Sequence, residues 1–420
     1  IDANLPKGEL AYVRNVSADP NCEGLLFAGT GEGLYYSLDD GGHWTPLKDK
    51  LPPSPVTWTV VQKRFHDLVV STWGRGLYIL DDITPLEQMA KQPTTADVRL
   101  FTPRPTYRLS RDPHAYINFA LKAAPKSKVE IQIADSDGRV IRTMHKKGHP
   151  GINRVTWDMA YDDLVPVVLR TIPPEDPHIW EEVRFKGKDF RPLTHWGMPI
   201  VISGPLAVPG HYEVRLTVDG KTETAPLDIL RDPNSEADQA GMEATLKLQL
   251  RIADDVKQVA HRINLAEQMR AQLEKLEAKY THDSQMEQSV RAMDQEVQGV
   301  EYALLSRYLA PSDDKIYASA YKDYYNLLWL NAEIGTGAGD VAGGADFGPT
   351  DTESNLLAMI EQNVQKDSAA YDAVLAHDIP AFNQSLKAKG AAPLDTNLQP
   401  LPDLRKAYAK VMRDEAADSE

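Results

Sequence analysis

Cysteine is almost missing from the chain, which has Cys22 alone among 420 residues. A single cysteine can form neither an intrachain disulfide nor a cysteine-based metal cluster. Long apolar runs are missing as well, because no stretch approaches the roughly 18 consecutive apolar residues from which a transmembrane helix is built. The sequence therefore excludes a disulfide scaffold and predicts no membrane insertion.

Positive charge is in the minority. The chain has 46 Lys and Arg against 61 Asp and Glu, which gives a net charge of −15, and no run rich in Lys and Arg offsets it. Negative charge repels both the phosphates of nucleic acids and anionic lipid surfaces. We therefore expect neither a nucleic acid nor a membrane as a partner.

Recognisable catalytic motifs are also missing, including Gly-x-Ser-x-Gly and His-Glu-x-x-His. Acidic residues abound, yet no spacing singles out two carboxylates that would face each other across a sugar. His66 and Asp67 could form an acid/base couple, although their place in a terminal turn favours a structural role. His145 and His149 have no third ligand that would make a metal site, so no metal is predicted. Whether the parent protein is an enzyme stays open.

What the chain does contain is a repeat. Residues 25–40 read LLFAGTGEGLYYSLDD and residues 67–82 read DLVVSTWGRGLYILDD. In each copy, two apolar runs rich in strand-forming residues flank a glycine turn. A repeat of roughly 40–45 residues built of short strands is typical of a β-propeller blade. Residues 1–85 are therefore predicted to form the last blades of a propeller.

The first copy ends in a turn of the Asp-box type, Ser-x-Asp-x-Gly-x-x-Trp, formed by Ser37, Asp39, Gly41 and Trp44. In such a turn the Asp carboxylate accepts backbone N–H bonds, glycine adopts a positive φ, and tryptophan covers the blade. These four residues are predicted to be structural. The carboxylates could also bind Ca²⁺, but no ligand pattern supports it, so no cofactor is predicted.

At these residues the chain resembles the sortilin-like, Asp-box (BNR-repeat) propellers of large secreted bacterial proteins that are labelled as glycosyl hydrolases. A terminal blade ending in residues 73–83, then a β-sandwich, then a helical tail ending near Asp378–Asn383 matches the closing order of that family. The second copy departs from the Asp-box, because Leu80–Pro85 has no Gly or Trp at the required places. We interpret it as the point where the chain leaves the propeller. The resemblance implies an extracytoplasmic location, whether secreted, periplasmic or on the cell surface.

Closed propellers need roughly four to eight blades, whereas this chain supplies a little under two. It starts at Ile1 without a signal segment, as a fragment or a processed piece would. Two blades alone would expose a sheet edge and the apolar faces that carry Leu26, Ala28, Val69 and Ser71. The predicted partners are therefore the remaining blades, from the parent polypeptide or from another chain.

Residues 98–232 alternate apolar and polar side chains in several runs, including residues 115–121, 128–134 and 211–218. This pattern predicts an immunoglobulin-like β-sandwich without the cysteine pair of antibody domains. A long irregular insert at about residues 159–204 interrupts it. Its aromatic residues are predicted either to form a surface for a glycan or protein partner, or to be buried where the loop folds over the sandwich or the propeller. The candidate surface residues are Trp180, His195 and Trp196.

Residues 236–395 show apolar spacings of three and four, which predict a helical bundle, and residues 396–420 are predicted to be a solvated tail. Residues 244–280 and 285–308 should form an antiparallel helix pair. Two further helices are expected at residues 316–334 and 352–389. The predicted seam of the pair contains Leu250, Ile263, Leu273, Val290 and Val297.

Two functions are consistent with these patterns. In the first, the chain is a non-catalytic binding and assembly module that holds protein or glycan partners. In the second, it is the C-terminal part of a sialidase-like propeller glycoside hydrolase whose catalytic residues lie in blades outside this chain. We favour the first, because every strong signal in the sequence is architectural.

Overall fold

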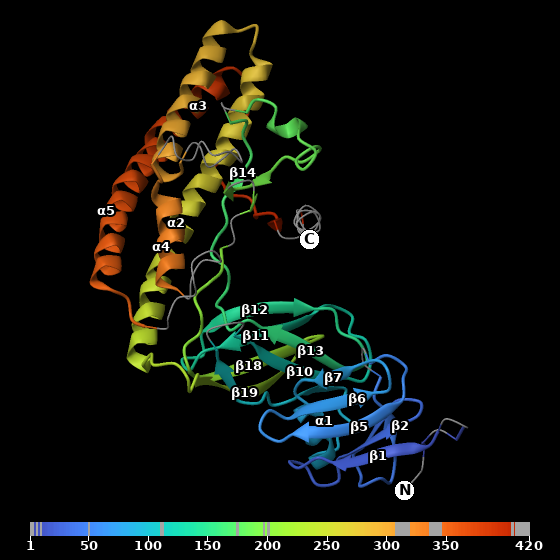
Figure 1. The fold of residues 1–420 in the computed structure, drawn as a ribbon. Helices are drawn as coiled ribbons and strands as arrows, with labels where there is room; N and C mark the ends of the chain where they lie inside the picture. The colour runs from blue at the N-terminus through green and yellow to red at the C-terminus, as the bar shows by residue number, and fades with distance from the viewer. Residues whose placement is uncertain are drawn as a thin grey trace. The chain divides into compact units, whose positions relative to one another are not determined.

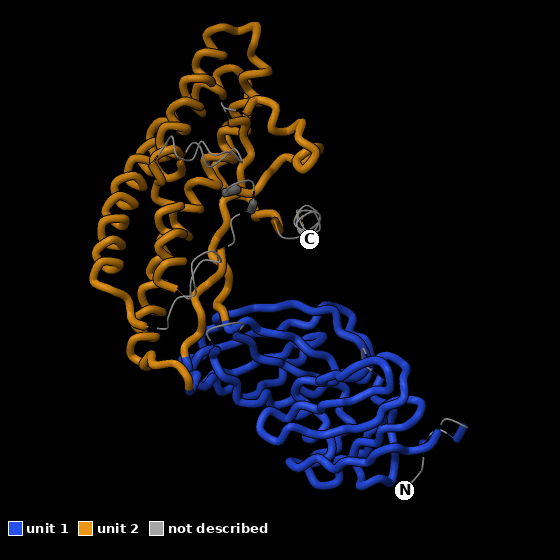
Figure 2. The backbone as a smooth tube through the Cα atoms, viewed as in Figure 1, with its two compact units in different colours: residues 1–159, 209–233 blue, residues 160–208, 234–420 orange. Residues whose placement is uncertain are grey.

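A computed structural model describes residues 4–5, 7–8, 11–48, 51–109, 113–173, 176–195, 198–199, 202–306, 320–335, 347–404 and 407. The chain divides into two compact units, coloured separately in Figure 2. Unit 1 contains residues 1–159 and 209–233, and unit 2 contains residues 160–208 and 234–420. Each unit is thus built from two separate stretches of chain.

Unit 1 begins with two antiparallel sheets, one for each copy of the repeat. The strands of the first sheet pair in sequence order and are β1 (Val13–Ala18), β2 (Leu26–Thr30), β3 (Leu34–Ser37) and β4 (Thr45–Pro46). Those of the second also pair in sequence order and are β5 (Val56–Gln62), β6 (Asp67–Thr72) and β7 (Leu77–Leu80). Gly33 and Gly76, with φ of 145° and 83°, lie in the turns before β3 and β7, where a residue without Cβ avoids strain.

The two sheets share one core. Side chains from both sheets are fully buried in it, among them Phe27 of β2 and Leu68 of β6. Helix α1 (Thr84–Lys91) follows β7, and its Leu86 joins the same core. The sequence patterns described above do not predict this helix. Its signals are local, with Pro85 in the first turn and Glu87 beside it, where a negative charge favours the helix N-terminus.

Two further sheets complete unit 1, as Figure 1 shows. The three-stranded sheet has the order β13-β10-β8 and the five-stranded sheet has the order β12-β11-β18-β19-β9. Their strands are β8 (Val98–Leu100), β9 (Thr106–Arg108), β10 (Ala115–Leu121), β11 (Val129–Ala134), β12 (Val140–Lys146), β13 (Gly151–Trp157), β18 (Gly210–Val218) and β19 (Lys221–Arg231). All pairs are antiparallel except β19 with β9. Trp157 and Tyr212 meet edge to face with ring centroids 6.0 Å apart, which packs one sheet on the other.

Unit 2 contains the helices, which are α2 (Gln239–Lys279), α3 (Ser284–Leu304), α4 (Asp323–Ile334), α5 (Asp351–Ala373) and α6 (Ile379–Ala388). Side-chain caps fix three of their starts: Asp238 accepts the N–H of Gly241, Asp283 accepts that of Met286, and Thr350 forms a capping box with Glu353. No helix in the described part of the chain is long and apolar enough to cross a membrane.

The predicted pairing of the first two long helices matches α2 and α3, which lie beside each other in Figure 1. Ile263, Leu273, Val290 and Val297 are fully buried in the seam. The prediction for Leu250 was wrong, because its side chain is only half-buried. The buried stripe in that turn runs through residues 248, 252 and 256, and position 250 lies off this stripe by part of a turn.

The predicted helix at residues 352–389 is interrupted. A turn of π-helix, Val374–Asp378, separates α5 from α6 and is followed by Pro380, which removes a backbone donor. The shorter helix begins at Asp323, and residues 307–319 lie outside the described residues. Most of the predicted tail, residues 408–420, lies outside them too.

The irregular insert belongs to unit 2, so the expectation that it folds over the sandwich or the propeller was wrong. Its short strands are β14 (Val168–Leu169), β15 (Arg191–Pro192), β16 (Thr194–His195) and β17 (Met198–Pro199). Two buried polar side chains of α2 hold it. Asn264 accepts the N–H of Val168, and Glu267 accepts those of residues 170 and 171. Each bond satisfies a backbone donor that would otherwise be buried without a partner.

Candidate functional site

The outer face of the β5-β6-β7 sheet is apolar and uncovered in the described part of the chain. Strand pairing arranges it in two rows, Val60–Val69–Ile79 and Trp58–Ser71–Leu77. Trp58 is 61% exposed, Leu77 73% and Ile79 62%. Full burial of one such side chain stabilises a protein by about 1.5–3 kcal/mol. A contiguous exposed apolar face of this kind is a candidate interaction surface.

The opposite, inner face of the same sheet is buried. Along β5 the side chains alternate, so that Thr59 and Val61 point inward while Trp58 and Val60 point outward. Leu68 and Val70 of β6 also point inward and are at most 2% exposed. A sheet with one polar face would show apolar residues on one side only. This sheet is apolar on both sides, as a sheet packed between two others would be.

The two repeat sheets are built alike. Each first strand carries an irregularity at the same place, between Val13 and Asn15 in β1 and between Val56 and Trp58 in β5. Beyond it, Ser17 pairs with Phe27 in the first sheet as Val60 pairs with Val69 in the second. The rows continue to Tyr36 and Ile79 respectively. The uncovered face of the second sheet thus corresponds to the Ser17–Phe27–Tyr36 face of the first.

That corresponding face of the first sheet is covered, and the second sheet covers it. Phe27 is completely buried. Ser17 Oγ and Thr59 Oγ1 are 2.7 Å apart, and Asn15 Oδ1 accepts the N–H of Thr59 at 3.0 Å. A Cβ on Gly29 would lie 2.8 Å from Val56 Cγ1, so the backbones approach closely. The chain therefore contains one example of how this type of face is filled.

The four residues expected to need cover differ in exposure. Leu26, Val69 and Ser71 are half-buried. The expectation for Ala28 was wrong, because its side chain is completely buried. Ala28 lies between Val16 and Tyr35 in the strand pairing, and these larger neighbours enclose its single methyl group. The exposed apolar residues of the β5-β6-β7 face are instead on β5 and β7, and Val13 and Val16 of β1 are exposed as well.

The predicted Asp-box residues occupy one turn. Ser37 Oγ donates to Asp39 Oδ1 at 2.8 Å and accepts the N–H of Gly41 at 2.9 Å, while Gly41 has a φ of 84°. Asp39 Oδ1 also accepts the N–H of His43. Hydrogen bonds from the His43 imidazole and backbone lower the pKa of Asp39 to about 2. Trp44, next in the chain, is 3% exposed.

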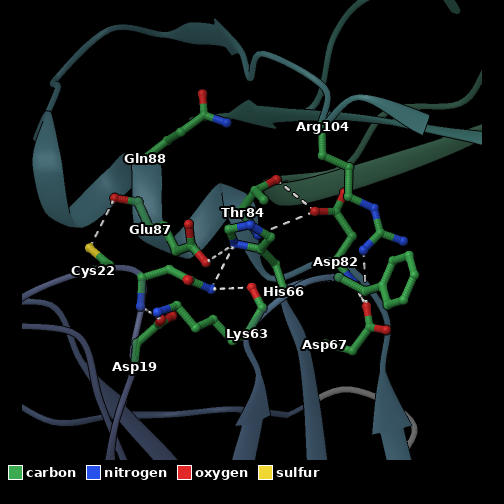
Figure 3. Close-up of polar contacts among 12 residues, drawn as sticks. Asp19, Cys22, Lys63, His66, Asp67, Asp82, Thr84, Glu87, Gln88 and Arg104 are labelled. Carbon is green, nitrogen blue, oxygen red and sulfur yellow. Dashed lines mark hydrogen bonds and ion pairs between the residues drawn. The ribbon is translucent and has the colours of Figure 1, made fainter. Parts of the chain in front are cut away.

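His66 and Asp67 point to different partners, as Figure 3 shows. His66 Nδ1 lies 2.6 Å from Glu87 Oε1 of α1, whereas Asp67 Oδ1 accepts bonds from Arg104 at 3.2 Å and from the N–H of Asp82 at 2.9 Å. They therefore form no couple with each other. The sequence reading missed Glu87 as the partner of His66, because no local pattern joins a turn to the helix that follows the next strands.

Figure 3 also shows a buried acidic residue beside this histidine. Asp19 is 5% exposed, and burial, together with the nearby Glu87 carboxylate, raises its pKa. His66 itself has a φ of 55°, a conformation that costs energy for a residue with Cβ. The cluster joins the loop after β1, the turn before β6 and helix α1. These contacts hold the three segments of unit 1 together. The described residues of the cluster do not line an open cavity for a substrate.

The other candidate residues lie apart. His145 Nε2 pairs with Glu130 at 3.3 Å, and no group of three or more His, Cys, Asp and Glu side chains among the described residues is placed to hold a metal ion. Trp180 lines a cavity of about 600 Å³ on unit 2. Trp196 and the side chain of His195 lie outside the described residues. In sequence comparisons, no protein family and no curated protein matches the chain.

Proposed function

We propose that the chain is a non-catalytic binding and assembly module whose β5-β6-β7 face docks a further antiparallel sheet of the same repeat. The observation that carries the proposal is the correspondence between this uncovered face and the face of the first sheet that is filled within the chain. A sheet that met Val60, Val69 and Ile79 as β5 and β6 meet Phe27 would bury all three. Burying this area would drive the association.

The same observations support the expected architecture. Two stacked sheets that share the same strand pairing, with an irregularity at the same place in the first strand, are what successive blades of a propeller would show. Two facing sheets in residues 98–232, antiparallel except for the pair β19 with β9, are consistent with an immunoglobulin-like sandwich. Membership of the sortilin-like, Asp-box group and an extracytoplasmic location follow from the resemblance in sequence and belong to the proposal. So does the origin of the docked sheet in the parent polypeptide or a partner chain.

The hydrolase alternative stays a prediction, since its catalytic residues would lie in blades outside this chain. The assembly proposal, in contrast, can be tested on the residues of this chain. It requires the outer face of the second sheet, and no other exposed apolar group, to control association.

The experiment compares the 420-residue chain with the triple variant Trp58→Thr/Leu77→Thr/Ile79→Thr, in which the threonines keep strand propensity. In isolation the face has only copies of this chain to meet, so we expect concentration-dependent association by light scattering. The triple variant should remain monomeric. A matched control, Val140→Thr/Ile152→Thr/Val183→Thr, alters three other exposed apolar residues and should associate as the wild type does.

A wild-type chain that stays monomeric at every concentration would contradict the proposal. So would equal association of the wild type and the triple variant, provided that circular dichroism shows both to be folded. A control variant that becomes monomeric would place the association surface elsewhere.

A further inference from the structure

The cavity beside Trp180 has fixed walls. It lies on unit 2 between helix α2, the insert and residues 395–399. Gln268 and Gln272 of α2 hold the last of these segments, because Gln268 Nε2 donates to Asn397 O at 2.9 Å and Gln272 Oε1 accepts the N–H of Asp395 at 2.8 Å. Glu267 holds the insert on the other side. A binding site on such walls is largely formed before its ligand arrives.

Two cations line this cavity without an ion pair. The Arg170 guanidinium and the Lys275 ammonium have no carboxylate partner among the described residues. Elsewhere in unit 2 arginines do pair, as Arg251 does with Glu361 at 2.7 Å and Arg262 with Asp372 at 2.8 Å. The lining also contains the Lys188 ammonium and the carboxylates of Asp189, Glu274 and Asp395. Glu274 and Asp395 accept backbone N–H bonds from Ile172 and Asn397 within the walls. Arg170 and Lys275 therefore remain available to pair with an anion that enters the cavity.

The remaining lining groups suit a ring. Trp180 is half-buried and packs against the small cluster of Ile179 and Phe185. This packing fixes the position of the indole. Indole faces stack on flat or sugar rings. The Asp189 carboxylate, also at the cavity, can accept hydrogen bonds from hydroxyl groups. A volume of about 600 Å³ lies within the range of sites for small organic ligands.

We infer that this cavity binds a sugar ring that carries a carboxylate, a uronic acid unit of an oligosaccharide. Arg170 receives the carboxylate through two parallel hydrogen bonds, which is the geometry that guanidinium provides best. Trp180 receives the face of the ring and Asp189 its hydroxyl groups. Lys275 adds a second positive charge. The site uses none of the residues of the β5-β6-β7 face. The sugar-binding inference can therefore be wrong while the assembly proposal holds, and the assembly proposal can be wrong while the sugar-binding inference holds.

The test measures binding of a disaccharide that ends in glucuronate to the full chain by isothermal titration calorimetry. The matching glucose disaccharide lacks only the carboxylate, and we expect it to bind at least tenfold more weakly. Arg170→Gln should weaken glucuronate binding at least tenfold and remove the difference between the two sugars. Trp180→Ala should weaken both. The matched controls are Lys366→Gln, an exposed cation, and Trp329→Phe, an exposed indole, and both should bind as the wild type does.

Equal binding of the acidic and the neutral sugar would overturn the inference. The absence of binding of the glucuronate disaccharide at millimolar concentration would overturn it as well. Phenylacetate is the second probe, because it offers a carboxylate and a flat ring without hydroxyl groups. If it bound as tightly as the glucuronate, the site would recognise aromatic acids and the assignment to sugars would be wrong. Unchanged affinity in folded Arg170→Gln would equally overturn it.

Discussion

Asn118 Nδ2 donates a 2.8 Å hydrogen bond to Asp82 Oδ2, and both side chains are buried. The other carboxylate oxygen of Asp82 accepts the N–H and the hydroxyl of Thr84 at the start of α1. Arg154 adds bonds to the carbonyl oxygens of Asp81 and Asp82. The end of the second repeat copy is thereby attached to β10 and β13. In the first copy Asp39 stabilises a hairpin turn. In the second copy Asp82, one position beyond the equivalent of Asp39, attaches the end of the repeat to the next sheet.

The Asp82 carboxylate should therefore hold unit 1 together. Asp82→Ala would leave Asn118 Nδ2 and Thr84 Oγ1 buried without partners, at about 1–3 kcal/mol for each such group. It would also place alanine at a φ of 55°. We expect a loss of several kcal/mol, measured by urea unfolding with a readout of unit 1. Asp81→Ala, at the exposed neighbouring position, is the control and should change stability little. Equal losses in the two variants would contradict the role of the buried pair.

Sequence patterns could predict some of this structure because the relevant forces are local. Glycine turns at Gly33 and Gly76 and apolar spacing along α2 each involve neighbours in the chain, so periodicity reveals them. The pair His66–Glu87 joins distant residues without a pattern, and it could not be found that way. The docking of the insert left one readable signal, since Asn264 and Glu267 interrupt an apolar run on the buried side of α2. Buried polar residues need hydrogen-bond partners, but the sequence alone does not show which groups those partners are.

Trp44 should stabilise unit 1 and take no part in binding. Its side chain is 3% exposed, and truncation of a buried aromatic residue to alanine costs about 3–5 kcal/mol. Trp44→Ala should lower the thermal midpoint of unit 1 clearly. Trp73→Ala removes the same side chain from a site where it is 69% exposed and should have a small effect. If association of the folded Trp44→Ala chain fell while its stability did not, Trp44 would belong to an interface.

Ile263 is completely buried in the seam between α2 and α3. Ile263→Asp would place a charge without a partner in this core, which costs several kcal/mol unless the helices separate locally. We expect amide hydrogen exchange in α2 and α3 to lose protection. His261→Asp introduces the same residue two positions away on the exposed side of α2 and controls for helix propensity. Retained protection in the Ile263 variant would count against this packing.

Asp323 should make unit 2 less stable as pH rises. The side chain is 4% exposed, its Oδ2 has no hydrogen-bond partner among the described residues, and burial followed by the nearby Asp367 carboxylate raises its pKa to about 7. An acid whose pKa is higher in the folded state than the ordinary 3.8 holds its proton more tightly when folded. Its contribution to stability is therefore complete below pH 3.8 and is lost as pH rises through about 7.

Asp323→Asn keeps the shape and removes the charge, so it should be nearly neutral at pH 4 and stabilising at pH 8. Each pKa unit corresponds to about 1.4 kcal/mol, which puts the gain at pH 8 at a few kcal/mol. Amide hydrogen exchange of the helix that contains Asp323, followed with increasing urea, reports the unfolding of this region. Asp254→Asn on the exposed side of α2 is the control and should show no such difference between the two pH values. A gain for Asp323→Asn that is the same at pH 4 and pH 8 would show that the carboxyl group does not titrate in this window.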